Sequence, residues 1–541
     1  MEVMDPDTIA GRVARAVDES GGGVAQPEAR LIRASLHIAA GAAGERLIPA
    51  SMTCTPEFGL GLTVVGTTRR LVVVSGKPQA LRDLEGEWTL LSAHGAALYF
   101  MVGPLSPANA AAVRGRLPFT APQLLGRGRS IGLGDRLGNA TAAHAAGLGA
   151  APLRPVFAQQ SVRELARTGR TPQQVLDDAT WGVLQAAYRA GYGADADHLK
   201  QPADIDAFAA AGFTLFTLDP GDWIDTTADA LSAPGAAARF ADLPWEALET
   251  RPADLRRRFI NCDVRIPSSV GALHIALAEE QLMRMALRFA GAIARVAALY
   301  RHLLTRRPAG AFELELSLDE TDRPLSAAEH YFVATELRRL GVAWHGLAPR
   351  LVGRFEKGVD YIGDVGEFRA HLAEHLAVAR HCGGYKLSLH SGSDKFRIYP
   401  DAAELAGDDL HVKTAGTSYV EALRVVARVA PALFRDIVVL ACQRFADERR
   451  SYHVSADAAR VPAVARLPDE DLPALLDQPD ARQVLHVTFG AVLTARTPDG
   501  APRFRERVRE VLAANEAEYH EVLARHIARH VRLLSGVGAT T

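Results

Sequence analysis

Residues 127 to 430 alternate short apolar runs with longer segments of helical periodicity. Helical patterns such as VLDDATWGVLQAAYRAG and LMRMALRFAGAIARVAALYRHLL lie between most of the runs. Alternating strands and helices predict a parallel sheet, and eight such units close a (β/α)8 barrel of the TIM type. The eight strand-like runs are SIGLGD near 130, PVFAQQ near 156, GADADHL near 194, FTLFTLD near 213, FELELSLDE near 312, AWHGLAP near 343, YKLSLHS near 385 and LHVKTA near 410.

Three other segments depart from this alternation. Residues 1–120 combine a helical start, the β-like runs GLGLTVVG, RRLVVVSG and AALYFMVG, and the helical SPANAAAVRGRL, which predicts an N-terminal α+β appendage. Residues 221–270 are expected to be an insertion in the barrel, which spans 121–430. Residues 431–541 predict a mainly helical C-terminal extension, ending in the amphipathic VREVLAANEAEYHEVLARHIARHVRLL, which we expect to pack on the barrel or on a partner.

Composition excludes several classes of protein. The net charge of −2 with 23% charged residues gives no basic field of the kind that nucleic-acid binding needs. The acidic start MEVMDPDTIAGR is not a signal peptide, and no apolar run reaches the roughly 20 residues of a membrane span. Four scattered cysteines without CxxC spacing predict neither a disulfide framework nor a thiolate zinc site. We expect a cytoplasmic protein that acts on a small molecule and could form a homo-oligomer.

Polar side chains gather at the ends of the predicted strands, where barrels of this type carry their active sites. The imidazoles of His198, His345 and His390 come from three different strands, and together they would suit zinc or another borderline divalent cation. Each histidine taken alone is more often a hydrogen-bonded structural residue. The other polar residues at strand ends are Asp135, Gln159, Gln160, Asp195, Asp197, Glu313, Glu315, His411 and Lys413.

The fifth strand carries carboxylates on one face. Glu313 and Glu315 share that face with Ser317, because apolar residues occupy the alternate positions. A carboxylate that points into a barrel is costly without a partner, so Glu315, the nearer to the mouth, is a candidate for function. Asp319 and Glu320 are expected in a solvated loop.

The first strand ends in a glycine-rich loop. Asp135 follows two glycines that allow close approach to a ligand, although it could also cap a helix or pair with Arg136. Gly132, Gly134 and Gly138 nearly match a dinucleotide fingerprint, but the third glycine is one place late. Nicotinamide binding is therefore a weak alternative.

Groups that suit an anion follow the last three strands. Lys395 and the amides of residues 414–418 come after strands seven and eight, where barrels commonly bind phosphate, and a sugar carboxylate would use the same donors. Arg354 and Lys357 follow the sixth strand as further anion contacts. The residues expected to bind substrate are Gln160, Arg354, Lys395, Lys413, Thr414 and Thr417.

Several long motifs carry a family resemblance. SIGLGDRLG, FAQQSVRELARTGRTPQQVLDDATWGV, GYGADADHLK, LAPRLVGRFEKGVDYIGD, YKLSLHSGSDKF and HVKTAGTSYVEALR resemble the tagaturonate/fructuronate epimerase family from about 127 to 430, with traces to the C-terminus. The resemblance implies a metal-dependent epimerase that interconverts D-tagaturonate and D-fructuronate. It also implies Asp135 and Glu315 as the acid/base pair, and His198, His345 and His390 as ligands of a divalent cation such as Zn, Mn, Ni or Co.

The chemistry of this interconversion narrows the mechanism. The two ketouronates differ at a carbon β to the ketone, whose hydrogen the carbonyl does not activate. We expect retro-aldol cleavage through a metal-stabilised enediolate and re-addition on the other face, with transient oxidation by a nicotinamide as the alternative. Two rival functions are a metal-dependent aldose/ketose isomerase acting on a sugar acid and a non-catalytic barrel that binds sugar acids.

Overall fold

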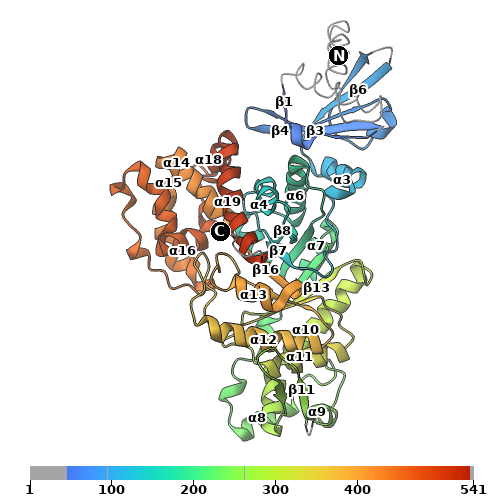
Figure 1. Cartoon of the computed structure of the whole chain (residues 1–541), viewed down its shortest axis with the longest axis vertical. Coiled ribbons are helices and arrows are strands. Elements are labelled where there is room, and N and C mark those ends of the chain that lie inside the picture. Colours follow the sequence, from blue (N-terminus) through green and yellow to red (C-terminus); the bar gives the residue numbers. More distant parts are fainter. Residues whose placement is uncertain (1–44, 56, 94–95, 261, 537–541) are drawn as a thin grey trace.

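The predicted barrel is confirmed. The structure, a computed structural model, describes residues 45–536 except 56, 94–95 and 261. Eight parallel strands pair in chain order and close on themselves (Figure 1). They are β7 (Ser130–Gly132), β8 (Arg154–Ser161), β9 (Gly193–Leu199), β10 (Leu215–Leu218), β13 (Glu313–Leu318), β14 (Gly346–Pro349), β15 (Lys386–Leu389) and β16 (Leu410–Lys413).

Helices connect the strands and cover the outside of the barrel. The predicted helices near 175 and 282 are confirmed as α6 and α10. Two of the helices begin with a capping box in which a serine and a glutamate exchange hydrogen bonds with each other's backbone amides, at Ser161 with Glu164 and at Ser326 with Glu329. The helices are α4 (Thr141–Leu148), α5 (Val162–Thr168), α6 (Pro172–Ala186), α7 (Pro202–Ala211), α10 (Glu279–Arg306), α11 (Ala327–Arg339), α12 (Val365–His381), α13 (Tyr399–Ala406) and α14 (Thr417–Val429).

The inner face of the barrel is polar. The strand register aligns Glu315 with Thr217, and Ser388 with His411 and Ser130. The residues between them, such as Leu314, point to the helices, because side chains alternate along a strand. Barrel interiors are usually filled by branched apolar residues. This barrel instead carries charged groups in its centre, which must be paired.

An antiparallel sheet of six strands lies beyond one end of the barrel (Figure 1). The three predicted β-like runs are confirmed as β3, β4 and β6, and α3 (Pro107–Arg116) follows, but β1, β2 and β5 were not predicted. Trp181 and Leu184 of α6 belong to the core of this sheet and attach it to the barrel. The predicted helical start lies outside the described residues. The strands are β1 (Arg46–Leu47), β2 (Thr53–Cys54), β3 (Phe58–Val65), β4 (Thr68–Ser75), β5 (Glu87–Ala93) and β6 (Ala96–Gly103).

The interval 221–270 lies at the opposite end of the molecule from this sheet (Figure 1). It begins with two short 3-10 turns and continues with α8 (Ala233–Ala241) and α9 (Pro252–Phe259). The hairpin of β11 (Val264–Ile266) and β12 (Leu273–Ile275) then leads into α10.

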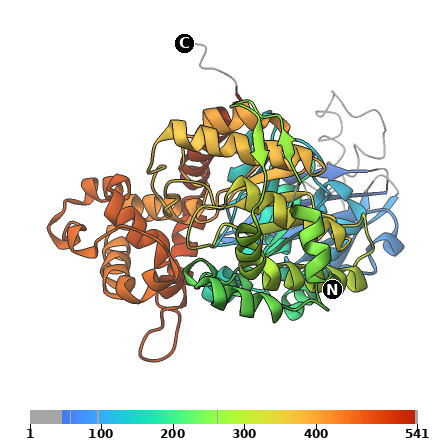
Figure 2. The same ribbon diagram turned by 90° about the horizontal axis from the view of Figure 1, so that it is seen from below.

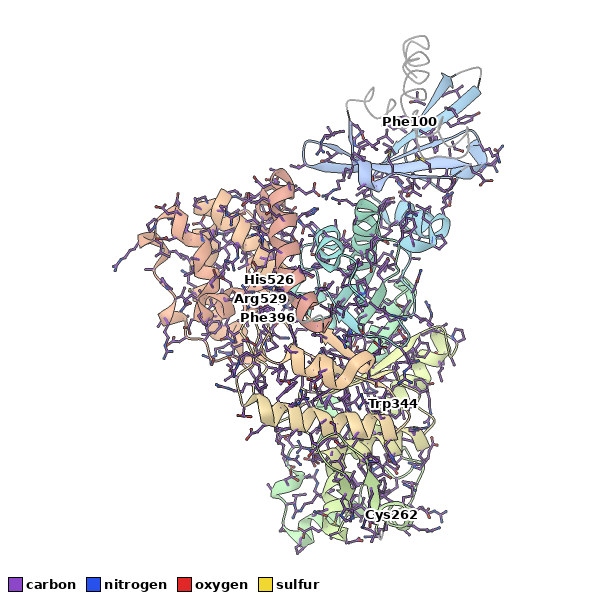
Figure 3. The ribbon with its side chains drawn as sticks, viewed as in Figure 1. Phe100, Cys262, Trp344, Phe396, His526 and Arg529 are labelled. Carbon is purple, nitrogen blue, oxygen red and sulfur yellow. The ribbon has the colours of Figure 1, made fainter. Side chains whose placement is uncertain are left out.

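The C-terminal helices form a layer on one side of the barrel (Figure 2). The predicted terminal helix is two helices, because the backbone at Asn515 leaves the helical region. α19 contacts α4, α13 and α14, and on it Arg529 stacks over Phe396 beside His526 (Figure 3). No described helix is both long and apolar enough to cross a membrane. The helices are α15 (Pro431–Glu448), α16 (Pro479–Val487), α17 (Phe489–Thr494), α18 (Arg505–Ala514) and α19 (Glu516–Leu534).

Candidate active site

A cavity of about 610 Å³ opens at the carboxyl ends of the barrel strands. Its walls come from the ends of β9, β13, β15 and β16 and from the loop after β14, with residues 450, 452 and 453 of the C-terminal extension closing one side. This volume is in the range of small-molecule sites. The extension therefore completes the cavity as well as covering the barrel.

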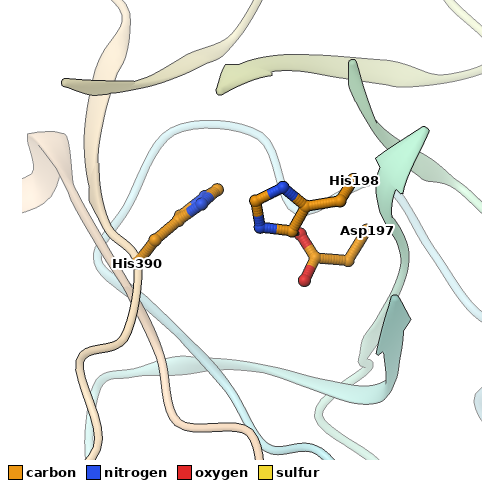
Figure 4. Close-up of side chains that lie close together, drawn as sticks. All are labelled: Asp197, His198 and His390. Atoms are coloured by element: carbon orange, nitrogen blue, oxygen red, sulfur yellow. The ribbon is translucent and has the colours of Figure 1, made fainter. Parts of the chain in front are cut away.

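Two of the three predicted imidazoles meet in this cavity. The ring centroids of His198 and His390 are 5.1 Å apart, and the rings lie edge to face at an interplanar angle of 70°, with Asp197 beside His198 (Figure 4). One nitrogen or oxygen atom from each of these three residues lies within 4.8 Å of the others. Two imidazoles and a carboxylate at this spacing could hold a divalent cation.

Each imidazole is oriented by a buried carboxylate. His198 Nδ1 lies 3.0 Å from Asp219 Oδ2, and His390 Nε2 lies 2.7 Å from Glu315 Oε1. A carboxylate only accepts hydrogen bonds, so we assign the N–H to these nitrogens. In the neutral rings His198 Nε2 and His390 Nδ1 then carry the lone pairs, as in the carboxylate–histidine pairs that support metal ligands, and a bound cation would take the place of the second ring proton.

The charges around the two rings attract a cation. Burial alone would lower the pKa of His198, but the charge of Asp197 and the hydrogen bond to Asp219 outweigh it and raise the pKa to about 9. Burial alone would also lower the pKa of His390, but the charge of Asp319 outweighs it and raises the pKa to about 10. His390 Nδ1 lies 3.2 Å from Asp319 Oδ1, yet it makes no well-aligned hydrogen bond among the described residues. This donor set fits a divalent cation.

Lys413 is the centre of a buried ionic network beneath the imidazoles. Its Nζ lies 2.7 Å from Asp195 Oδ2, 2.7 Å from Asp197 Oδ1 and 2.8 Å from Glu315 Oε1, and it donates to Thr217 Oγ1 at 2.9 Å. Lys413 lines the cavity, but carboxylates already surround its ammonium group, so its predicted role in binding substrate stays a prediction. Glu315 does not line the cavity. Its contacts with His390 and Lys413 indicate that Glu315 orients His390, and they fit this role better than the predicted role as an acid or base.

Backbone strain accompanies both imidazoles. His198 has φ of 55°, and Ser391, directly after His390, has φ of 51°. Residues other than glycine rarely adopt this left-handed region, and such strain collects at functional sites.

His345 does not join the other two imidazoles, so this predicted ligand is wrong. It precedes β14, and its Nδ1 accepts the amide of Leu314 near the start of β13 at 3.2 Å. His345 therefore lies at the amino-terminal end of the strands, away from the cavity. The error arose because the run AWHGLAP becomes a strand only from Gly346 onward.

Asp135 is occupied by its own loop, so its predicted role as an acid or base also needs correction. Its Oδ1 accepts the amides of Leu137 at 3.0 Å and Gly138 at 2.8 Å, and its Oδ2 accepts the amide of Ala140 at 2.6 Å. These are the amides that a pyrophosphate would need at a dinucleotide fingerprint. The same contacts remove the support for the nicotinamide alternative.

Four of the six predicted substrate contacts are absent from the cavity lining. Lys395 Nζ donates to the carbonyls of Glu356, Val359 and Ser393 at 2.6 to 2.8 Å, so it fastens two loops together. Thr414 Oγ1 donates to the carbonyl of Gly132 at 2.7 Å. Thr417 and Gln160 are buried, and Gln160 is paired with Ala196 on the helix-facing side of the sheet, whereas Gln159 is paired with Asp195.

Arg354 does line the cavity, as predicted, together with Lys357. Asp219 was not singled out from the sequence. The signal was present, because Asp219 ends the predicted strand FTLFTLD, just as Asp197 lies near the end of the predicted strand GADADHL. Asp319 and Glu320 were assigned to a solvated loop, whereas both line the cavity. The available signal was that Asp319 and Glu320 directly follow the strand on which Glu313, Glu315 and Ser317 alternate with apolar residues, which places them at the end of that strand.

Comparison with known proteins identifies the family. The sequence profile of a family described as tagaturonate epimerase matches residues 60–534. A relative from Thermotoga maritima named tagaturonate/fructuronate epimerase is 43% identical over 428 residues, which cover 79% of this chain and 85% of the relative. A glycerol-complexed crystal structure of fructuronate-tagaturonate epimerase from Cohnella laeviribosi covers 93% of this chain and 99% of its own, with a TM-score of 0.83 at 35% identity. The native crystal structure of that protein has a TM-score of 0.83 at 34% identity and covers 92% of this chain and 98% of its own. The chain belongs to the tagaturonate epimerase family.

Proposed function

We propose that this protein interconverts D-tagaturonate and D-fructuronate, the reaction for which its relatives are named. The observation that carries the proposal is the arrangement of His198 and His390, which both line the cavity and are each bound to a buried carboxylate on one nitrogen. A divalent cation held there by Asp197, His198 and His390 would stabilise negative charge that develops on a ketone oxygen.

The residues of the cavity suit retro-aldol chemistry. Glu320 lines the cavity, lies within 4.8 Å of His198 and Asp219, and has Arg163 as an ion-pair partner at 3.3 Å. We assign it to take the proton of the hydroxyl on the carbon that is epimerised. Glu356 is less suited, because Ser455 and Gln483 already donate to its carboxylate.

The steps then balance without an external oxidant. As Glu320 takes the hydroxyl proton, the bond between this carbon and the carbon α to the ketone breaks. The electron pair moves toward the ketone oxygen and leaves an enediolate and an aldehyde. The aldehyde carbon turns its other face, the carbon–carbon bond forms again, and Glu320 returns the proton.

One assay tests the proposal. The protein is treated with a chelator and supplied with tagaturonate, and Mn²⁺, Zn²⁺, Ni²⁺ or Co²⁺ is added back. We expect activity to return with a cation and the product to be a second ketose. An aldose product would instead indicate an isomerase, and binding without turnover would indicate a non-catalytic barrel.

A labelled fragment separates the two mechanisms. If the bond breaks, an added isotopically labelled three-carbon aldehyde should be incorporated into the product ketouronate. Transfer of hydride label from the substrate to a bound nicotinamide would contradict the retro-aldol route.

A further inference from the structure

Acidic and basic groups line the cavity and come from different elements. Asp197, Asp319 and the two imidazoles come from the ends of the strands, whereas Arg350, Arg354 and Lys357 come from the loop after β14, and Arg163 comes from α5. A sugar acid carries its charge at one end and its ketone near the other. The basic groups of the loop after β14 are therefore candidates to bind the carboxylate, and the imidazoles lie at the strand ends.

Lys357, like Arg350, differs from Arg163 and Arg354 because no carboxylate pairs with it among the described residues. Arg163 pairs with Glu320 at 3.3 Å, and Arg354 pairs with Glu356 at 3.5 Å. Among the described residues no carboxylate lies within 4.0 Å of the Lys357 ammonium group. Burial, followed by the charge of Arg163, lowers its pKa, which is the effect expected of an ammonium group that lacks a counter-ion.

The loop that carries Lys357 is held firmly. The carbonyl of Lys357 accepts Gln483 Nε2 at 3.1 Å, and on either side Lys395 binds the carbonyls of Glu356 at 2.8 Å and Val359 at 2.6 Å. Gly358 has φ of 74°, and a side chain there would come within 3.3 Å of His486. The position of Lys357 is thus fixed before any ligand binds, which reduces the entropy cost of binding.

We infer that Lys357 binds the carboxylate of the substrate and sets the preference of the cavity for a sugar acid over the corresponding neutral sugar. This inference deepens the proposed function and rests on it for the identity of the substrate. An ion pair at this site would also hold the carboxylate end in place while the aldehyde carbon turns at the other.

The test compares an acid with its neutral counterpart by calorimetry, so that it does not depend on turnover. D-gluconate and D-sorbitol are titrated into the Mn²⁺-loaded protein, its Lys357→Met variant and its Lys357→Arg variant. We expect the native protein to bind gluconate more tightly than sorbitol. Lys357→Met should weaken gluconate binding roughly 10- to 100-fold, as expected for the loss of a charged hydrogen bond, and should change sorbitol binding little. Lys357→Arg should restore part of the preference.

A matched control and two outcomes decide the inference. Lys77→Met removes the same group from an exposed pair with Glu57 on the N-terminal sheet and should not change gluconate binding. Equal binding of gluconate and sorbitol by the native protein, or unchanged gluconate binding by Lys357→Met, would overturn the inference. So would an adduct on Lys357 trapped by borohydride with tagaturonate, because it would make Lys357 a nucleophile. If gluconate binding depends on Lys357 but tagaturonate is not epimerised, the carboxylate site stands and the proposed function fails.

Discussion

Two clusters of aspartate and histidine each take one residue from the loop after β15, His390 in one and Asp394 in the other, and they are built for different tasks. The first is Asp197, His198 and His390 in the cavity, and the second is Asp394, His526 and His530 beneath the C-terminal helix. Both bring three ligand atoms within 4.8 Å of one another. Composition and spacing alone do not distinguish them.

The difference lies in what else binds each atom. In the second cluster, Arg482 lies 2.9 Å from Asp394 Oδ2 and supplies the compensating charge. His530 Nε2 accepts the amide of Asp394 at 3.1 Å, and its Nδ1 donates to the carbonyl of His526 at 3.0 Å. Both nitrogens of His530 are therefore used within the protein. The comparison indicates a cation site in the cavity and a structural junction that docks α19 onto the β15 loop.

The largest effect should follow loss of an imidazole from the first cluster. His390→Ala removes a proposed ligand, and several kcal/mol of lost stabilisation correspond to a fall of roughly a thousandfold in kcat/KM. Metal content after dialysis, measured by mass spectrometry, should fall with it. His530→Ala is the matched variant in the second cluster and should retain the cation. A His390→Ala protein that keeps one cation per chain contradicts the assignment of the first cluster.

Removing the arginine of the second cluster should affect stability and leave cation binding intact. Arg482→Met leaves the buried carboxylates of Asp394 and Glu421 without their shared partner, which should cost roughly 3–5 kcal/mol of unfolding free energy. Urea unfolding measures this cost. Arg428→Met, which breaks a surface pair with Glu518, is the control and should cost at most about 1 kcal/mol. Similar losses in the two variants would mean that the second cluster is not a structural junction.

The barrel could be predicted from sequence because its signals are local and repeated. Strand runs of alternating polarity and the intervening helical patterns predicted all eight strands, since both depend on neighbours along the chain. His198 and His390 followed from the rule that active sites lie at strand ends. The sequence placed Lys413 correctly at the end of a strand. Its partners come from β9, β10 and β13, and no local pattern predicts them.

The remaining errors depend on long-range contacts or on a boundary. His345 was misplaced because the strand starts at Gly346, three residues after the start of the run AWHGLAP. Lys395 resembles an anion-binding loop lysine in sequence, yet three carbonyls, two of them from a loop more than 30 residues away, surround it in the structure. The Asp135 carboxylate accepts hydrogen bonds from the amides of its own loop. Whether a polar group faces a ligand depends on such competing partners.

The second cluster should also make the protein sensitive to acid. Burial lowers the pKa of His530 to about 4, against about 6.5 in an unfolded chain. The unfolded state therefore takes up the proton first, so this stabilisation is complete above pH 6.5 and is lost as the pH falls toward 4. Between pH 7 and pH 5 the loss should be roughly 2 kcal/mol.

Urea unfolding of the native protein and of His530→Gln at these two pH values measures this contribution. Other buried histidines are common to both proteins, so their effects cancel in the difference. An equal loss of stability in the two proteins would show that His530 is not held neutral by its surroundings.

The smallest effect tests how the first cluster is oriented. Asp219→Asn keeps the shape of the side chain but removes the charge that fixes the N–H on His198 Nδ1. Loss of such a supporting carboxylate typically costs 10–100-fold in metal affinity. Competition with a chelator should detect this, and Asp394→Asn, the equivalent change in the second cluster, should leave cation affinity unchanged. If Asp219→Asn also binds the cation normally, the orientation of the imidazole cannot be what separates the two clusters, and the charge of Arg482 would have to account for the difference alone.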